Sequence, residues 1–257
     1  MIYLDNSATT KPCAEAVAAM THALTENWGN PSALYGFGFD AARALRDARQ
    51  TVAAALGAEP DRVFFTSGGT EADNWAILGA ARRFGKKHKH IVTTAMEHHA
   101  VLHTLKELEI QGFEVTYLQP DDPGRITVAD LKAALRKDTF LVSIMMVNNE
   151  VGSVMPIAQM AKLTHKLCPD AIFHTDAVQA FGKLPMDDTD ADLISASAHK
   201  FHGPKGMGFI YMKKRHSLPA YIIGGGQEGG FRSSTENTPG IAGMGLAAEM
   251  ACSDLIM

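Results

Sequence analysis

Short apolar runs alternate with helical segments along nearly the whole of this 257-residue chain. The apolar runs occupy residues 62–66, 90–94, 114–118, 139–147, 171–175 and 192–196. Strands that are buried on both faces of a sheet read in this way, whereas strands with one wet face alternate between polar and apolar residues. The pattern therefore predicts an α/β fold, with a mostly parallel sheet covered by helices on both faces.

The segments between the apolar runs carry the helical signals. The clearest is residues 39–56, where Leu45 and Val52 share an apolar face, Arg43 and Asp47 lie mostly away from it, and Gly57 ends the helix. Thr127 and Asp130 have the spacing of a capping box. Further helices are predicted over residues 12–26, 71–84, 100–111, 127–136, 156–167 and from 239 onward, and a short strand is predicted over residues 2–4.

Composition excludes several classes of protein. The hydrophobic content of 46% suits a chain with a substantial core, and a net charge of −4 gives no basic field for nucleic acid. No apolar run approaches the roughly 20 residues of a membrane span, and the first residues lack the features of a signal peptide. Three cysteines without CxxC spacing, Cys13, Cys168 and Cys252, argue against a disulfide framework or a zinc site. We therefore expect a cytoplasmic protein without nucleic-acid or membrane partners.

Polar residues follow the two apolar runs at 171–175 and 192–196. Asp176 stands at the end of the first, and Ser197, Ala198, His199 and Lys200 follow the second. Ligands of α/β folds collect at the carboxyl ends of strands. An aspartate or a lysine in such a place is common by itself. Together they match the needs of pyridoxal 5'-phosphate (PLP), which binds covalently to a lysine and has its ring nitrogen kept protonated by a carboxylate.

A glycine turn, Ser67-Gly68-Gly69-Thr70, joins a predicted strand to a predicted helix. Free backbone amides and a hydroxyl at a helix N-terminus make a site for a phosphate. A tight turn with Thr70 as the N-cap explains the same residues without a ligand. The turn is neither a P-loop nor a dinucleotide fingerprint, because it lacks the residues that define them.

Other polar clusters have two readings as well. His98 ends the run that begins at residue 90 and could stack on a flat cofactor ring, although a surface histidine is the simpler reading. His99 and His103 have a spacing that suits a metal ion, but no third ligand is apparent. The amides of residues 148–149 could bond a phenolic oxygen or form a turn. Residues 224–235 form a glycine-rich loop whose Arg232 suits either a linker or an anion site.

Eight motifs, taken in order, carry a family resemblance. They are LDNSATT, NPS, TSGGTEADN, EHHAVL, VNNEVG, DAVQAFGK, SASAHKFHGPKG and GGGQEGGFRSSTEN. This series resembles the cysteine desulfurases, which belong to the aminotransferase class V group of fold-type I PLP enzymes. The similarity spans essentially the whole chain.

The resemblance implies a role for particular residues. Lys200 matches the lysine that binds the cofactor, Asp176 the residue paired with the ring nitrogen, and His98 the histidine that stacks on the ring and moves protons. Gln179 and Asn149 match contacts near the phenolic oxygen. The phosphate-binding positions fall on Gly69, Thr70, Ser197, His199 and Thr235. Family members supply the contact of Thr235 from a partner subunit, so the resemblance also implies a homodimer.

The implied reaction converts L-cysteine to L-alanine and leaves sulfur as a persulfide on a mobile enzyme cysteine. That sulfur then serves iron–sulfur cluster assembly or thiolation, through a sulfur-acceptor or scaffold protein. Other implied possibilities are a selenocysteine lyase, another class V enzyme, or a non-catalytic fragment that binds PLP. A partner-binding remnant without a cofactor is a further alternative.

The sequence also departs from the family pattern. The family's attacking cysteine, and its arginine for the substrate carboxylate, lie in a C-terminal small domain, and none of the three cysteines here matches that motif. We therefore expect residues 1–257 to form the PLP-binding large domain, with the small domain absent. Tyr35 stands where the family usually has a histidine after the NPS motif. Residues 229–231 are Gly-Gly-Phe, where basic residues are common in the family.

Overall fold

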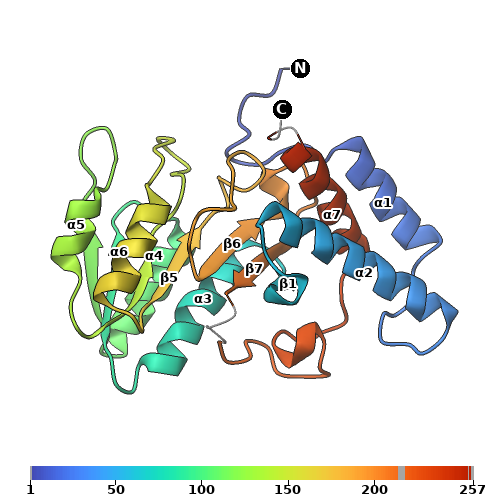
Figure 1. The fold of residues 1–257 in the computed structure, drawn as a ribbon. Helices are drawn as coiled ribbons and strands as arrows, with labels where there is room; N and C mark the ends of the chain where they lie inside the picture. Colours follow the sequence, from blue (N-terminus) through green and yellow to red (C-terminus); the bar gives the residue numbers. More distant parts are fainter. Residues whose placement is uncertain (1, 214–217, 254, 256–257) are drawn as a thin grey trace.

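The computed structural model describes residues 2–213, 218–253 and 255. In this part of the chain, a single sheet has the strand order β1-β7-β6-β5-β4-β2-β3 (Figure 1). The strands are β1 (Val63–Thr66), β2 (His90–Thr94), β3 (Glu114–Leu118), β4 (Thr139–Ser143), β5 (Ile172–Asp176), β6 (Leu193–Ser197) and β7 (Gly208–Met212).

The sheet is mostly parallel, as predicted. Strands β2 to β6 pair in parallel, and β7 runs antiparallel to its neighbours β6 and β1. A parallel connection needs a crossover of about a dozen residues or more, usually a helix. Between β6 and β7 lies only a short 3₁₀ turn, Ala198–Lys200, and a loop, so the chain reverses direction there.

Helices cover both faces of the sheet. They are α1 (Ala14–Thr25), α2 (Gly36–Ala55), α3 (Gly69–Phe84), α4 (His99–Ile110), α5 (Val128–Ala134), α6 (Ile157–Leu167) and α7 (Thr238–Ser253). Neighbouring residues of one strand enter different cores: Ile172 belongs to the cluster that contains residues of α3 and α4, and Phe173 to the one that contains residues of α2, α6 and α7. Burial on both faces explains why the strands read as continuous apolar runs.

Some predicted boundaries were wrong. Residues 2–4 form no strand, and Ile2 and Leu4 are exposed. Strand β4 ends at Ser143 rather than at residue 147, although the amides of Ile144 and Met146 still bond to carbonyls of β5. The capping box of Thr127 and Asp130 is confirmed at the start of α5. No helix among the described residues is long and apolar enough to cross a membrane.

Candidate active site

A cleft of about 690 Å³ opens beyond the carboxyl ends of β5 and β6, beside the start of α3. It brings together every predicted site residue except Thr235. The residues it gathers are Gly69, Thr70, His98, Asn149, Asp176, Gln179, Ser197, His199 and Lys200. The parallel strands place these residues side by side because their carboxyl ends meet at the same edge of the sheet.

Lys200 reaches the cleft from the 3₁₀ turn that follows β6. Its ammonium group donates hydrogen bonds to the backbone carbonyls of Ser7 and Ala8, the latter at 2.8 Å. Burial lowers the pKa of Lys200, and the negative charges of Asp176 and Asp5 oppose that shift in part. An amine with a lowered pKa loses its proton more readily and is better suited to nucleophilic and base chemistry.

Asp176 is the last residue of β5 and lies almost fully buried at the cleft. Its Oδ1 accepts a hydrogen bond of 2.8 Å from the backbone N–H of Val178. Burial raises the pKa of Asp176, while this hydrogen bond and the charges of His98 and Lys200 pull it back down. A ligand that places a positive charge on this carboxyl would compensate its burial, because an opposite charge nearby favours the ionised form.

The N-terminus of α3 forms the second wall of the cleft. The helix begins at Gly69, and its N-cap is Gly68, so the reading of Thr70 as a capping residue was wrong. Gly68 has φ of 150°, which glycine alone adopts readily. A Cβ on Gly69 would lie 2.7 Å from Cγ2 of Val178. The first amides of a helix have no intrahelical acceptor, so this close-packed turn presents N–H groups to an anion.

Ser197, the last residue of β6, and His199, in the 3₁₀ turn after it, line the cleft together with this turn. Nδ1 of His199 lies 3.0 Å from the hydroxyl of Thr9. Burial lowers the pKa of His199, and the positive charges of Lys200 and Lys205 lower it further. The imidazole is therefore neutral at physiological pH, and Lys205 adds a cation to the same wall of the cleft.

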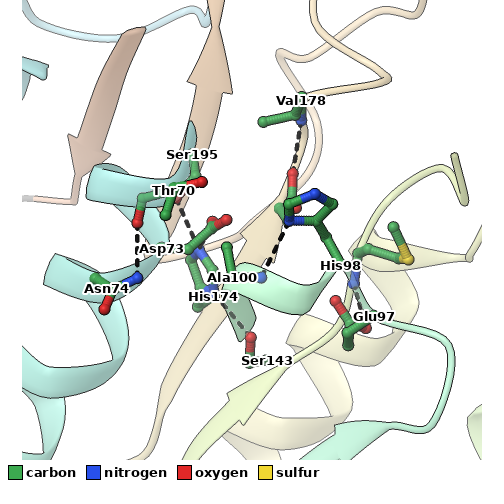
Figure 2. A network of polar contacts seen from close by, with 12 residues as sticks. Thr70, Asp73, Asn74, Glu97, His98, Ala100, Ser143, His174, Val178 and Ser195 are labelled. Atoms are coloured by element: carbon green, nitrogen blue, oxygen red, sulfur yellow. Dashed lines mark hydrogen bonds and ion pairs between the residues drawn. The ribbon is translucent and has the colours of Figure 1, made fainter. Parts of the chain in front are cut away.

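Three other predicted residues already have partners in the chain. His98 is the N-cap of α4, and its Nδ1 accepts from the N–H of Ala100 at 3.1 Å (Figure 2). Gln179 donates from Nε2 to the carbonyl of Ser7 at 2.8 Å, and its Oε1 accepts from Lys183. Asn149 donates to Glu150 at 2.6 Å. The loop at residues 5–8 thus holds the side chains of both Gln179 and Lys200.

Thr235 lies outside the cleft. It is exposed and lines a separate pocket of about 60 Å³ together with Ser67 and Arg232. The guanidinium of Arg232 pairs with Glu71, with Nε to Oε1 at 2.8 Å. Burial opposes ionisation of Glu71, but the hydrogen bonds of Arg232 and Ser67 lower its pKa overall. Arg232 therefore clamps the glycine-rich loop to α3 and is not aimed at the cleft.

The remaining candidates from the sequence stay apart from the cleft. The rings of His99 and His103 stack with centroids 5.0 Å apart on α4, and the described residues contain no cluster of three or more metal-ligating side chains. The described lining of the cleft contains no cysteine. Burial raises the pKa of both Cys168 and Cys252, which disfavours their reactive thiolate forms.

Sequence reasoning missed several residues that line the cleft, namely Asp5, Ser7, Ala8, Asp73, Val178 and Lys205. A signal for Asp73 existed, because it stands one helical turn after Gly69 and Thr70 and therefore on the same face of α3. The signal for Lys205 was the GPKG turn. Nothing local in the sequence indicated that the loop at residues 5–8 would reach Lys200.

Comparisons with known proteins show the family to which the chain belongs. The family model described as aminotransferase class V matches residues 2–256, so the chain belongs to that family. It is 49% identical over 256 residues to a cysteine desulfurase IscS of Clostridium botulinum, and 48% identical to one of Methanosarcina thermophila. These alignments cover 99% of the chain in each case, but only 64% and 63% of the two relatives.

Solved structures give the same result. A NifS-like protein superposes with a TM-score of 0.96 at 42% identity, and the match covers 99% of this chain and 70% of that one. A structure described as SspA in complex with cysteine superposes with a TM-score of 0.93 at 40% identity, covering 97% and 72% of the two chains. The chain thus shares the fold of cysteine desulfurases, but it spans 63–64% of the length of these curated relatives and 70–72% of the two solved chains.

Proposed function

We propose that residues 1–257 form the cofactor-binding large domain of a PLP-dependent cysteine desulfurase. The observation that carries this proposal is the meeting of Lys200, Asp176 and the N-terminus of α3 in one cleft. The similarity to cysteine desulfurases and to a structure holding cysteine supports the same substrate class.

The residues of the cleft fit PLP by their chemistry. The close-packed turn at Gly68 and Gly69, with Ser197 and His199 beside it, suits a phosphate group. The buried carboxyl of Asp176 suits a protonated ring nitrogen, and the amine of Lys200 suits an aldehyde. His98 would lie against the ring, with Asn149 and Gln179 near its phenolic oxygen. When bound, the cofactor supplies an electron sink for the substrate's Cα.

The protein's own groups then move protons and orient the substrate. The lowered pKa of Lys200 makes Nζ lose its proton more readily, so that the amine can take a proton from the substrate and return it. The carbonyls of Ser7 and Ala8 hold Nζ in place while the amine is charged. His98 stands at the rim of the cleft, where an imidazole can exchange protons with the substrate.

Sulfur transfer completes the proposed reaction. A thiolate attacks the sulfur of L-cysteine, the C–S bond breaks, and a proton returned to carbon gives L-alanine. The attacking thiol becomes a persulfide, so no external oxidant or reductant is needed. We propose that this thiol lies in a small domain, within the part of the relatives' length that this chain does not span. In that view sulfur passes onward to an acceptor protein for cluster assembly or thiolation.

The remaining parts of the proposal concern assembly and location. Thr235 is exposed and outside the cleft of its own chain, which fits a residue that completes the phosphate site of a second subunit in a homodimer. We propose the cytoplasm as the compartment. A selenocysteine lyase would share this cleft, and side-by-side assays with cysteine and selenocysteine would separate the two activities.

The first test is the visible absorption of the purified chain after incubation with PLP. The wild type is expected to develop the band of a lysine-bound cofactor, and Lys200→Ala should lose that band completely. Lys205→Ala is a matched control that removes a lysine from the same cleft but leaves Lys200, so its band should persist. If Lys200→Ala kept the wild-type band, the assignment of Lys200 would be wrong.

A further inference from the structure

A buried network of polar side chains lies on the α3 side of the sheet (Figure 2). One of its members, Asp73, interacts electrostatically with Asp176. The strands β4, β5 and β6 contribute Ser143, His174 and Ser195, and α3 contributes Asp73. The three strand residues are 0% exposed and Asp73 is 1% exposed. Asp73 nonetheless touches the cleft, because it is part of the cleft lining.

The side chains of this network contact one another directly. Nδ1 of His174 lies 2.8 Å from the hydroxyl oxygen of Ser143, and Nε2 lies 2.9 Å from that of Ser195. Ser195 also faces the side chain of Asp73, where a hydrogen bond from its hydroxyl lowers the pKa of the carboxyl. Oδ1 of Asp73 lies 3.6 Å from Nε2 of His174 and has no hydrogen-bond partner. A buried, unpartnered carboxyl oxygen is costly, more so when it is charged.

Counting the available hydrogens leaves two possible arrangements of the hydrogen bonds in this network. Burial lowers the pKa of His174 to about 3, so the imidazole is neutral and carries a single N–H. If that hydrogen is on Nε2, Ser195 accepts it and its own hydroxyl points at an ionised Asp73. If it is on Nδ1, Ser195 donates to Nε2 and can accept a hydrogen bond from a protonated Asp73. The tautomer of His174 therefore reports the charge of Asp73.

The charged groups around Asp73 favour the second arrangement. Burial raises the pKa of Asp73 well above its usual value, and the negative charge of Asp176 raises it further, while the hydrogen bond from Ser195 opposes the shift only in part. No lysine or arginine of the described residues forms an ion pair with Asp73, whereas the positive charge of Lys200 lowers the pKa of Asp176. His174 is neutral and supplies no counter-charge.

We propose that Asp73 is a positioning residue that stays protonated and donates a hydrogen bond to Ser195. The negative charge at the cleft floor is then carried by Asp176. This rests on the proposed function, since the charge of Asp176 is meant for the ring nitrogen of PLP. The hydrogen bonds that link Ser143, His174 and Ser195 then orient the hydroxyl of Ser195 so that its oxygen can accept from Asp73. An ionised Asp73 would compete with Asp176 for the same positive charge.

The decisive experiment is NMR of the chain without cofactor, with labelled aspartate and histidine. At neutral pH the carboxyl carbon of Asp73 is expected to show the protonated form, and His174 is expected to carry its hydrogen on Nδ1. Asp73→Asn, whose amide donates as the protonated acid does, should keep that tautomer. An ionised Asp73 at neutral pH, or a hydrogen on Nε2, would overturn the proposal.

A second measurement links Asp73 to the cofactor. In the PLP-loaded chain, Asp73→Asn should match the wild-type visible band near neutral pH but lack a shift that the wild type shows at higher pH, where Asp73 ionises. Asp47→Asn, on the exposed surface of α2, should titrate like the wild type. Identical titrations of Asp73→Asn and the wild type would contradict the link. A failure to bind PLP would count against the proposed function, and the NMR result would still decide the state of Asp73.

Discussion

The carboxyl groups near the two ends of strand β6 differ in whether they have charged partners. At its amino end, which we call the paired end, Asp192 lies 2.7 Å from Nε2 of His165 and accepts the N–H of Phe173, and Asp190 lies 2.6 Å from Nζ of Lys213. At its carboxyl end, Asp73 and Asp176 are buried at the cleft without an ion pair to a lysine or arginine among the described residues.

The difference appears in the pKa values. Burial alone would raise the pKa of Asp190, but the hydrogen bond and charge of Lys213 lower it overall. At the cleft end the pKa values of Asp73, Glu97 and Asp176 are all raised, with burial as the main cause. Buried carboxyls without counter-charges cost stability, so their concentration in one cleft marks that end for ligand chemistry.

The largest expected change in stability comes from replacing Glu97, one of the buried carboxyls at the cleft end. Burial raises the pKa of Glu97 to about 8, whereas the unfolded chain has its ordinary value. Because the folded pKa is raised, the wild type should lose stability as pH rises from about 4.5 to about 8, by an amount on the order of 4 kcal/mol. Glu97→Gln should lack this loss, so its advantage over the wild type should grow with pH. Denaturant unfolding at several pH values measures the difference.

The glutamine retains an oxygen that can accept from Thr94 and from the N–H of Met145, as Oε1 of Glu97 does. Glu249→Gln, on the exposed surface of α7, is the matched control and should follow the wild-type pH profile. A constant difference between Glu97→Gln and the wild type at all pH values would show that Glu97 is ionised in the folded chain.

A second prediction concerns the backbone of the cleft wall. Gly69→Ala forces a Cβ to within 2.7 Å of Val178 and should destabilise the fold by about 1–3 kcal/mol, while weakening phosphate binding at the turn. Gly36→Ala is a close control, because Gly36 also begins a helix but has no atom within 4 Å of its added Cβ. Thermal unfolding should show a loss only for Gly69→Ala. Equal effects would mean that helix-start glycines matter here for entropy alone.

The sequence predicted the parts of this site that depend on strand ends. Asp176 and Lys200 could be placed together because each follows a buried strand, and parallel strands bring such ends to one edge. The same logic placed the turn before α3. Its start was predicted at residue 71 rather than at Gly69, because the close contact with Val178 that explains the glycine is a tertiary feature.

Pairings between distant residues could not be predicted. The sequence left Arg232 open between a linker residue and an anion ligand, because nothing nearby in sequence marks Glu71 as its partner. The loop at residues 5–8 contacts Lys200 across most of the chain. Asp73 and Glu97 read as ordinary helix and turn residues, since their raised pKa values come from burial that only the packed fold produces.

The smallest effect is expected at the paired end. Lys213→Met removes the cation that holds the pKa of Asp190 down, yet this pair is partly exposed, so the loss should be under about 1 kcal/mol and should shrink in high salt. Because the folded pKa of Asp190 is lowered, its stabilisation is present above the unfolded value and disappears as the pH falls through the folded one. The stability gap between variant and wild type should therefore close below about pH 4. Glu97 should respond in the opposite direction, because its destabilising effect on the fold grows as the pH rises. A gap that widened in acid would mean that the paired end does not balance charge as the geometry indicates.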